Sequence, residues 1–460
     1  MEKQGRHIMP KQNARTLSGF MELLPQKQMY FDAMINRLQE AYSLYGFTPL
    51  DTPIIEAAEV LLAKGGGETE KQIYRLTKGD TDLALRFDLT VPLAKYVALH
   101  YGQLTFPFRR FQIGKVYRGE RAQRGRFREF YQADIDIIGD EKLSLLNEAE
   151  IPGVIYHTFK ALGLEEFVIR INNRKVLNGL FLAFGIADKS AQVMQTIDKL
   201  EKIGREKTLS ILVDDLSLDP NQAGQLLDLL AGNNKNQSPV AALSGFLGKN
   251  ELLDEGIEEL FTVSEYLSAF GVPDTHFQVD LTIARGLDYY TGTVYETIIP
   301  KHPEIGSICS GGRYDDLAEY YTDKKLPGVG ISIGLTRLFY VLDEQNYLND
   351  ALLTAPADVL ILPMTEDLTP SIQFATALRK AGMKTQIYGE DKKFKAKISY
   401  ADKLNIPFVV FIGEDEIAQG KVTVKDMTSG EQELLDPRMA AGKIKEAIAG
   451  KRALPPILAK

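Results

Sequence analysis

The stretch from Phe108 to Ile138 constrains the fold most strongly, because it has the pattern of two long strands joined by a charged loop. Residues 108–117 and 127–138 are rich in aromatic and β-branched residues, which favour strands. Glycines at 119 and 125 punctuate the connection between them, and glycine allows the backbone conformations that tight loops need. The sequence therefore predicts an antiparallel hairpin within a β-rich domain.

The hairpin also concentrates positive charge. From Arg109 to Arg128 the chain carries eight arginine and lysine residues against Glu120 alone. Such a cluster repels itself unless an anion binds there. The net charge of the whole chain is −8, which argues against non-specific nucleic-acid binding over the entire surface. We therefore predict a local site for polyphosphate or a nucleic-acid backbone at the hairpin.

A second unusual stretch runs from residue 285 to 296, where Arg285 precedes the adjacent Tyr289 and Tyr290. Residues 293–298 have the composition of a strand. If the strand register already holds at the two tyrosines, their side chains point to opposite faces, and one of them could share a cavity with the arginine. Arginine suits carboxylates and phosphates, and a phenol both donates and accepts hydrogen bonds. The stretch predicts a site for a polar, ionic small molecule, with a surface ion pair at a sheet edge as the alternative.

Two pairs of polar residues have the spacing to face a ligand. Asp88 and Thr90 lie two residues apart after a predicted strand, so they could share one side and hold an ammonium group. The alternative is an N-cap for the helix predicted at 91–101. Gln132 and Asp136 lie four residues apart on the second strand of the hairpin and should share a face.

The remaining chain predicts a division into domains. A helix is expected at 151–162, with Pro152 in its first turn or at a kink. Residues 179–270 have apolar residues at helical spacing, which predicts a helical insertion into the β-rich domain. After residue 356, strands and helices alternate as βαβαβ, which indicates a small parallel or mixed α/β domain. The predicted α/β (α+β core) architecture comprises a first core segment at 1–178, the insertion at 179–270, a second core segment at 271–350 and a C-terminal domain at 356–460.

Several classes of protein are disfavoured by the sequence. No apolar run approaches the ~20 residues of a membrane-spanning helix, and the polar, basic residues 1–13 do not form a secretory signal. The single cysteine, Cys309, fits a reducing compartment, and packing is its expected role because no histidine lies nearby in sequence. The five histidines lack zinc-ligand spacing. We expect a cytoplasmic protein without a metal site of its own and without a membrane association.

The motifs together resemble those of class II aminoacyl-tRNA synthetases, and specifically histidyl-tRNA synthetases. Residues 49–56, which contain two prolines, resemble motif 1, the dimer-interface motif, although a plain connection from helix to strand would have the same pattern. Residues 111–132 and 328–338 resemble motifs 2 and 3. Residues 285–292 and 311–315 resemble two motifs peculiar to the histidine enzymes. The C-terminal unit resembles the anticodon-binding domain of the same subclass, so the resemblance spans nearly the whole chain.

The resemblance implies ATP-dependent attachment of histidine to its cognate tRNA through a histidyl-adenylate, with Mg²⁺, by a homodimer. It implies that Arg118 bridges the carboxylate and the α-phosphate and that Arg285 stabilises the transition state. The further residues implied to bind ATP are Glu120, Arg126, Phe130 and Arg337. The residues implied to bind histidine are Asp88, Thr90, Gln132, Asp136, Arg285, Tyr289 and Tyr290, and those implied to contact the tRNA acceptor end are Arg121 and Gln123.

Two features qualify the resemblance. Many family members carry glutamate where this chain has Asp88 and Asp136. A non-catalytic paralogue that senses histidine or tRNA, such as the regulatory subunit of ATP phosphoribosyltransferase, is the alternative function. That paralogue typically lacks the C-terminal domain and has a degraded version of residues 285–290. Because both are present here, the enzyme, a histidine–tRNA ligase, is favoured.

Overall fold

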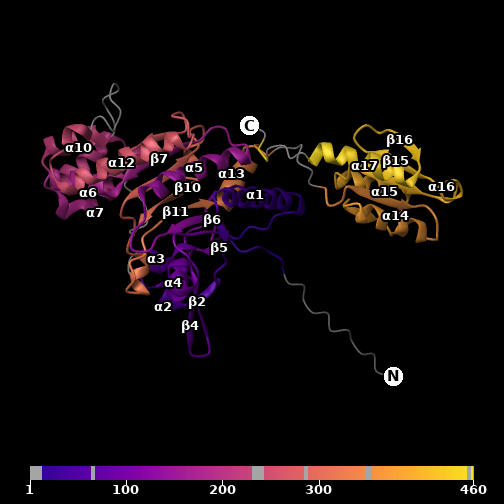
Figure 1. The fold of residues 1–460 in the computed structure, drawn as a ribbon, viewed down its shortest axis with the longest axis horizontal. Coiled ribbons are helices and arrows are strands. Elements are labelled where there is room, and N and C mark those ends of the chain that lie inside the picture. The colour runs from indigo at the N-terminus through magenta and orange to yellow at the C-terminus, as the bar shows by residue number, and fades with distance from the viewer. Residues whose placement is uncertain are drawn as a thin grey trace. The chain divides into compact units, whose positions relative to one another are not determined.

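A computed structural model describes residues 13–63, 68–230, 243–283, 289–348, 355–452 and 457–458. The chain divides into two compact units (Figure 1). The larger unit contains Ile35–Asn346 and the chain up to Glu22, and the smaller contains Tyr347–Ala459 and Leu23–Met34. Among the helices within these ranges, none has the length and apolarity that crossing a membrane requires.

The larger unit is built on an eight-stranded sheet in the order β1-β5-β6-β11-β10-β9-β7-β8. Neighbouring strands run antiparallel except at the two edges, where β1 pairs with β5 and β7 with β8 in parallel. The strands are β1 (Thr48–Pro49), β5 (Phe108–Tyr117), β6 (Glu129–Ile138), β7 (Val168–Asn173), β8 (Phe277–Val279), β9 (Thr293–Ile298), β10 (Cys309–Tyr314) and β11 (Gly328–Gly334).

The predicted hairpin is confirmed as β5 and β6, which pair along their full lengths next to the edge strand β1. Side chains alternate between the two faces of each strand. On one face, β6 and β11 contribute the buried apolar residues of the core. On the opposite face, the same strands present Gln132, Asp134 and Asp136 opposite Gly334, Ser332 and Gly330. The site described below lies on this polar face.

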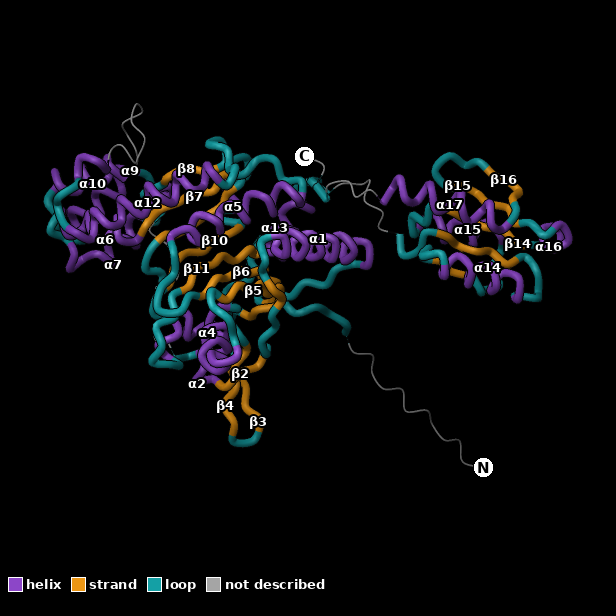
Figure 2. Tube along the Cα trace, viewed as in Figure 1, coloured by secondary structure: helices purple, strands orange, loops and turns teal. Residues whose placement is uncertain are grey.

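Helices pack against this sheet and against one another. Helix α5 (Leu145–Leu162) contacts β11, and α13 (Leu335–Glu344) contacts β6. Among the described residues between β7 and β8, all regular secondary structure is helical (Figure 2). The helices are α6 (Arg174–Ala183), α7 (Ser190–Ile197), α8 (Leu200–Ile203), α9 (Arg205–Ser210), α10 (Pro220–Leu230) and α12 (Glu251–Ala269), with short 3-10 or π turns between some of them.

Helix α5 begins earlier than the sequence predicts. The predicted start at residue 151 is wrong, because the helix begins at Leu145, where the Ser144 side chain caps it by accepting a hydrogen bond from Leu146 N (3.2 Å). Pro152 therefore lies inside the helix. Proline has no N–H to donate to the carbonyl four residues earlier, and Glu148 O instead accepts a hydrogen bond from the Tyr295 hydroxyl (2.6 Å). A neighbouring strand thus compensates for the proline.

The larger unit also contains a three-stranded sheet in the order β2-β4-β3. Its strand β4 ends shortly before Asp88, and α4 starts at Thr90. The predicted position of Asp88 between a strand and a helix is confirmed, whereas Thr90 is already the first residue of the helix. The elements of this region are α1 (Pro25–Leu44), β2 (Ile55–Ala57), α2 (Ala58–Leu61), α3 (Glu68–Gln72), β3 (Arg75–Lys78), β4 (Thr81–Leu85) and α4 (Thr90–His100).

The smaller unit contains a five-stranded mixed sheet in the order β13-β12-β14-β15-β16. The three parallel strands were predicted, whereas the antiparallel pair at one edge was not. Buried apolar residues from both faces form two clusters against the helices. The elements are β12 (Val359–Pro363), α14 (Thr369–Lys380), β13 (Thr385–Ile387), α15 (Phe394–Lys403), β14 (Phe408–Ile412), α16 (Glu414–Gln419), β15 (Val422–Asp426), β16 (Gln432–Leu435) and α17 (Pro437–Arg452).

Candidate active site

Two adjoining cavities lie on the polar face of the eight-stranded sheet. We call them the basic cavity, of about 320 Å³, and the acidic cavity, of about 370 Å³. Both volumes are in the range of small-molecule sites, roughly 300–1,000 Å³. The residues that line both are Arg118, Gln132, Ser310 and Ser332.

The basic cavity is lined by three arginines and one acidic residue, Glu120. Arg118 follows β5 directly, and its guanidinium lies over the rings of Phe87 (4.4 Å) and Phe130 (5.1 Å). Its Nε donates to Phe87 O at 3.3 Å. Burial lowers the pKa of Arg118, but a guanidinium keeps its charge at neutral pH. A positive group is therefore fixed at the wall that the two cavities share.

The other two arginines complete the charge of the basic cavity. Arg337, in the first turn of α13, donates to the carbonyl oxygens of Ile305 and Ser307. Burial lowers its pKa, and the nearby Arg126 lowers it further. Arg126 in turn lies 3.6 Å from a carboxylate oxygen of Glu120. Three guanidinium groups against one carboxylate make this cavity a site for an anion.

The floor of the acidic cavity is a row of side chains from β6. Gln132, Asp134 and Asp136 all line it and are buried, so the predicted shared face of the first and last is confirmed. Burial raises the pKa of Asp134 to about 7 and that of Asp136 to about 6. Within the described ranges, Gln132 Oε1, Asp134 Oδ1 and Asp136 Oδ2 accept no hydrogen bond. Buried acceptors of this kind need a donor, which a ligand can supply.

Asp136 is nevertheless held in place by protein groups. The Tyr314 hydroxyl donates to its Oδ1 at 2.6 Å. Arg110 Nη2 lies 2.7 Å from Oδ2, and since this oxygen accepts no hydrogen bond, the contact is an ion pair without hydrogen-bond alignment. Both oxygens of this carboxylate therefore already have a partner.

Asp88 lies two residues before the first residue of α4, Thr90. Its Oδ1 accepts a hydrogen bond from Val91 N at 3.0 Å, in the first turn of the helix, although the N-cap position itself is occupied by Leu89. Asp88 and Thr90 also line the acidic cavity. Burial raises the pKa of Asp88, which backbone hydrogen bonds and Arg118 oppose.

The expectation that Tyr289 and Tyr290 point to opposite faces is wrong. It assumed a strand register, but both residues precede β9, which starts at Thr293. Their rings lie 5.0 Å apart at 72°, and both line the acidic cavity. Burial raises the pKa of each phenol, so both stay protonated and can donate hydrogen bonds.

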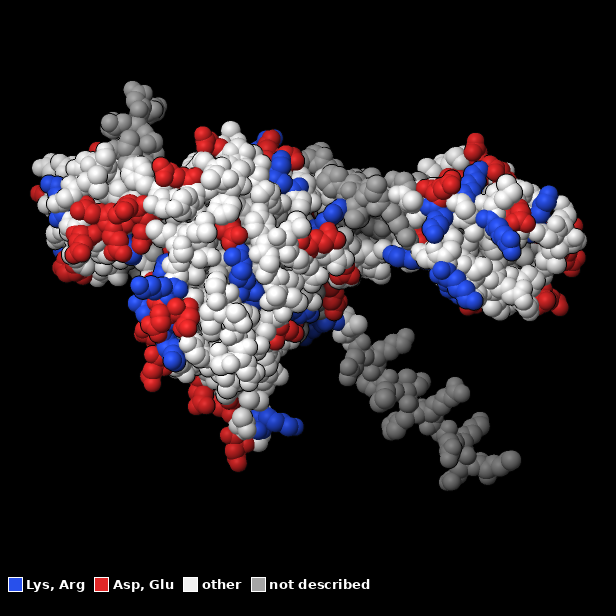
Figure 3. Space-filling view, viewed as in Figure 1, with Lys and Arg blue, Asp and Glu red and all other residues white. Residues whose placement is uncertain are grey.

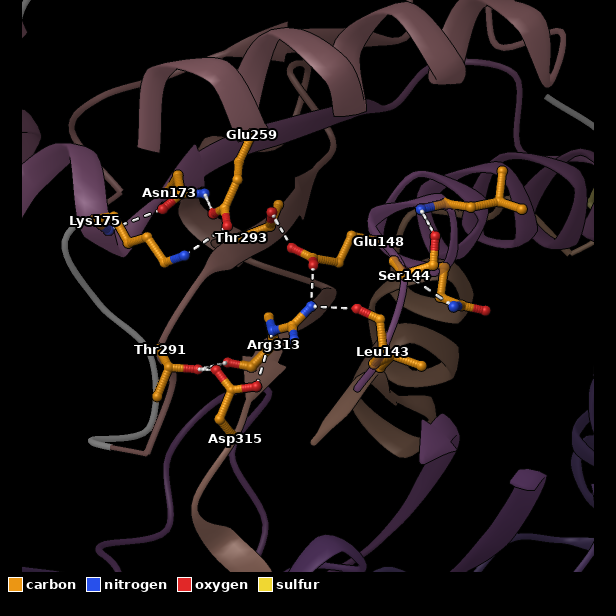
Figure 4. A network of polar contacts seen from close by, with 12 residues as sticks. Leu143, Ser144, Glu148, Asn173, Lys175, Glu259, Thr291, Thr293, Arg313 and Asp315 are labelled. Atoms are coloured by element: carbon orange, nitrogen blue, oxygen red, sulfur yellow. Dashed lines mark hydrogen bonds and ion pairs between the residues drawn. The ribbon is translucent and has the colours of Figure 1, made fainter. Parts of the chain in front are cut away.

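A buried polar network fixes the chain directly after these tyrosines (Figure 4). Arg313 Nη1 lies 2.6 Å from a carboxylate oxygen of Glu148, and its Nε lies 3.0 Å from Asp315. Thr291 donates to Asp315 through Oγ1 (2.5 Å) and to Arg313 O through its backbone N–H (2.8 Å). Thr293 donates to the other carboxylate oxygen of Glu148 (2.5 Å). The network links α5, β9 and β10 and holds the end of the segment that carries Tyr290.

Glycine is required where β11 crosses under the acidic cavity. A Cβ at Gly330 would lie 2.2 Å from Asp136 Oδ1 and 2.5 Å from Ile135 O. The absent side chain lets the carboxylate lie against the neighbouring strand. At Gly334, four residues further on, a Cβ would meet Arg337 at an ordinary 3.8 Å.

Some predicted site residues do not join this arrangement. Arg285 lies outside the described residues. Arg121 and Gln123 are exposed and line neither cavity. Gln123 forms a β-bridge with Arg126. Both of the exposed residues thus lie on the hairpin loop beside the basic cavity.

Several residues that line the acidic cavity were not among the predicted site residues, including Asp134, Glu296, Ser310 and Ser332. Asp134 could have been found, because it alternates with Gln132 and Asp136 on one strand. Ser332 lies opposite Asp134 on β11, and Glu296 lies opposite Ser310. Those pairs follow from strand order, which no local pattern in the sequence specifies.

A mostly antiparallel sheet with a basic hairpin beside its central cavities, together with a C-terminal mixed α/β unit, is the architecture of a class II aminoacyl-tRNA synthetase. Residues 19–338 match the family model described as histidyl-tRNA synthetase, and residues 358–447 match that of an anticodon binding domain. A histidine–tRNA ligase of Clostridium tetani is 52% identical over 431 residues, which cover 94% of this chain and 98% of that protein. The chain therefore belongs to the histidyl-tRNA synthetase family.

Solved structures agree with this assignment. The histidyl-tRNA synthetase of a Nostoc species has a TM-score of 0.86 and 41% identity, covering 95% of this chain and 100% of that chain. A Bacillus halodurans protein described as an ATP phosphoribosyltransferase regulatory subunit/histidyl-tRNA synthetase has a TM-score of 0.71 at 22% identity, covering 87% and 98%. The second likeness shows the fold alone. The predicted fold class and the predicted enzyme class, a histidine–tRNA ligase, are confirmed by the family and the first two relatives.

Proposed function

We propose that this chain joins histidine to its cognate tRNA in two steps, through a histidyl-adenylate made in the two cavities. The observation that carries the proposal is that a cation-rich cavity adjoins a carboxylate-rich one, with Arg118 in the wall common to both. An anionic nucleotide suits the first cavity and a cationic amino group suits the second. The reacting carboxylate and α-phosphate would then meet beside Arg118.

In the first step, a histidine carboxylate oxygen attacks the α-phosphorus of ATP and the bond to the β-phosphate oxygen breaks, releasing pyrophosphate. The carboxylate is already ionised, so the step needs alignment and charge stabilisation rather than a general base. Arg118 would contact both reacting anions. Arg285 would stabilise the charge that develops on the α-phosphate, a role that rests on the family resemblance of its sequence motif.

ATP would occupy the basic cavity. Phe130 would stack on adenine, with Arg337 on its other face, and Glu120 would help to position the base. Arg126 and Arg337 would also bind the outer phosphates. The three arginines carry the charge that a triphosphate needs, which supports this placement over the acidic cavity.

Histidine would occupy the acidic cavity. Asp88, Thr90 and Gln132 would bind its α-amino group, while Asp136 and Tyr290 would face the imidazole and Tyr289 would line the ring. The three buried acceptors on β6 that receive no hydrogen bond from the described residues support a ligand rich in N–H donors. A cavity of this kind rejects analogues that lack those donors, because its own polar groups would stay unpaired.

Mg²⁺ would enter with the nucleotide. This ion usually keeps several waters and is held by one or two carboxylates together with substrate phosphates. The basic cavity offers Glu120 as its one carboxylate, and the described part of the chain contains no group of three potential metal ligands. The donor set fits an ion carried mainly by the phosphates of ATP. Bound there, it would offset phosphate charge during displacement.

In the second step, a ribose hydroxyl of the tRNA would attack the histidyl carbonyl and release AMP. Arg121 and Gln123, exposed on the hairpin loop beside the basic cavity, would contact the acceptor end. The unit that matches the anticodon binding domain would bind the other end of the tRNA. Removing the residues beyond Ala355 should spare pyrophosphate exchange but weaken tRNA charging; full charging by the shortened chain would overturn the assignment of the C-terminal unit.

We further propose a homodimer in the cytoplasm. Ile54 and Ile55, in the segment that resembles the dimer motif, are 40% and 48% exposed, which supports a partner surface there. Sedimentation tests this directly, since a monomer at micromolar concentration would contradict it. The single, buried Cys309 fits a reducing compartment.

Histidine-dependent exchange of labelled pyrophosphate into ATP is the test of the proposed function. Exchange that requires histidine is expected. Exchange with a different amino acid would identify a different synthetase. No exchange with any amino acid would favour a sensor such as the regulatory subunit of ATP phosphoribosyltransferase.

A further inference from the structure

We propose that Asp134, rather than Asp136 alone, determines specificity for histidine by accepting a hydrogen bond from an imidazole N–H of the substrate. The inference deepens the proposed function and rests on it. Asp134 is 1% exposed and lines the acidic cavity. Its Oδ1 accepts no hydrogen bond from any residue that the structure describes, so this acceptor is available to a ligand.

The first reason for this assignment is that both carboxylate oxygens of Asp136 already have protein partners. Tyr314 donates to its Oδ1 (2.6 Å), and Arg110 Nη2 lies beside its Oδ2 (2.7 Å). A substrate N–H would have to compete with these groups. Asp134 lies two residues earlier on the same face of β6. The Ser332 side chain hydrogen-bonds to this carboxylate, but Oδ1 accepts no hydrogen bond from the described residues and can accept one from a ligand.

The charges in the acidic cavity give the second reason. Its lining carries the carboxylates of Asp88, Asp134, Asp136 and Glu296 against the guanidinium of Arg118. Buried charge without a partner is costly, and Arg110 pairs only with Asp136 among these residues. A ligand that brings N–H donors with positive character therefore relieves the cavity. Asp134 has a hydrogen bond with the Ser332 side chain, but its Oδ1 accepts none from the described residues.

The neighbours of Asp134 assign it to the ring end of the substrate. Tyr290, which faces the imidazole in the proposed function, is affected electrostatically by Asp136 and then by Asp134. Asp88 lies just before α4, where its Oδ1 accepts a hydrogen bond from Val91 N. A ring placed between Tyr290 and β6 would present an N–H to Asp134.

The test is the isosteric variant Asp134→Asn, compared with wild type in histidine-dependent pyrophosphate exchange. We expect the KM for histidine to rise about 10- to 100-fold, the range for loss of a hydrogen bond to a charged group, while the KM for ATP changes less than about twofold. A structural role would instead lower thermal stability. We expect the ligand-free variant to be as stable as wild type or more stable, because an unpaired buried carboxylate is removed.

Two comparisons make the outcomes decisive. Asp136→Asn should lower the melting temperature, because it leaves Arg110 buried without its partner. The ring fragment 4-methylimidazole should raise the melting temperature of wild type more than that of Asp134→Asn; equal shifts would overturn the assignment to the ring. An unchanged histidine KM in Asp134→Asn would overturn the proposal, whereas failure of wild type to exchange pyrophosphate with histidine would overturn the proposed function itself.

Discussion

The two cavities share a wall and a sheet face, yet their charges are opposite. The basic cavity gathers Arg118, Arg126 and Arg337 around a single carboxylate, Glu120. The acidic cavity gathers four carboxylates and several phenols around the one arginine that both cavities share. The charged groups of the basic cavity come largely from the hairpin loop and the start of α13, whereas those of the acidic cavity come largely from strands. The positive and negative charges of the site therefore come from different kinds of element.

This difference explains how one surface can orient two substrates. In the proposed function, the basic cavity would attract the nucleotide and the acidic cavity would attract the ammonium group. The carboxylate and the α-phosphate, which repel each other, would both be attracted to the guanidinium of Arg118. Figure 3 shows that acidic and basic side chains are both spread in patches over the visible surface.

Removing the shared cation should have the largest effect. We expect Arg118→Ala to reduce the rate of pyrophosphate exchange by a factor of about 10² or more, the loss typical of removing one charge-stabilising donor in a transition state. Steady-state pyrophosphate exchange at saturating histidine and ATP measures this rate. Arg124→Ala is the matched control, because this arginine lies on the same hairpin but pairs with Glu344 at the surface. Equal losses in both variants would show that general positive charge, not the position of Arg118, matters.

A change confined to the acidic cavity should have a smaller and selective effect. Gly330→Ala would place a methyl group against the Asp136 carboxylate and the Ile135 carbonyl, forcing both to move. We expect a destabilisation of about 1–3 kcal/mol from overpacking and a rise of about tenfold in the KM for histidine. Calorimetry and exchange kinetics measure the two.

Gly334→Ala is the matched control on the same strand. Its Cβ would make only an ordinary contact with Arg337, so the KM for histidine should stay within about twofold of wild type. A rise in the histidine KM for this control, whose residue lines the basic cavity, would mean that the cavities are not independent. An unchanged histidine KM for Gly330→Ala would mean that the position of Asp136 does not affect histidine binding.

The sequence predicted the parts of this site that depend on local pattern. The hairpin was visible because two strands of alternating residues flank a glycine-bounded loop, and the shared face of Gln132 and Asp136 follows from strand geometry. The position of Asp88 between a strand and a helix could also be predicted, because both elements have recognisable local patterns. The C-terminal parallel strands could be predicted because strands alternate there with helices.

The parts that the sequence did not reveal depend on strand order or on long-range compensation. Asp134 and Ser332 are about 200 residues apart in sequence and meet because β6 pairs with β11. Glu148 was overlooked because Pro152 suggested that the helix starts there. In the structure the helix begins earlier, and the Tyr295 hydroxyl donates a hydrogen bond to the Glu148 carbonyl oxygen, which the proline cannot bind. Tyr289 and Tyr290 line one cavity because the chain before β9 is not a strand. Each of these errors comes from extending a local rule across a tertiary contact.

The smallest expected effect is on how the free energy of unfolding depends on pH, because the acidic cavity holds carboxyl groups with raised pKa values. Burial raises the pKa of Asp134 to about 7 and of Asp136 to about 6, and it also raises that of Asp88. The ordinary value for aspartate is about 3.9, so the folded protein binds more protons than the unfolded chain between about pH 4 and pH 7. The contribution of these groups to the free energy of unfolding is full below about pH 4 and is lost as the pH rises through 6 and 7.

Ligand-free Asp134→Asn lacks one of these groups and should lose stability less steeply over that range. We expect its free energy of unfolding to gain on the order of 1 kcal/mol relative to wild type between about pH 5 and pH 8. Denaturant melts at both pH values measure it. Gly334→Ala, which changes no titratable group, should keep the same difference from wild type at both values. A pH-independent difference for Asp134→Asn would mean that this carboxylate is already paired in the free protein, and the contrast between an acidic and a basic cavity would then be weaker than the contacts indicate.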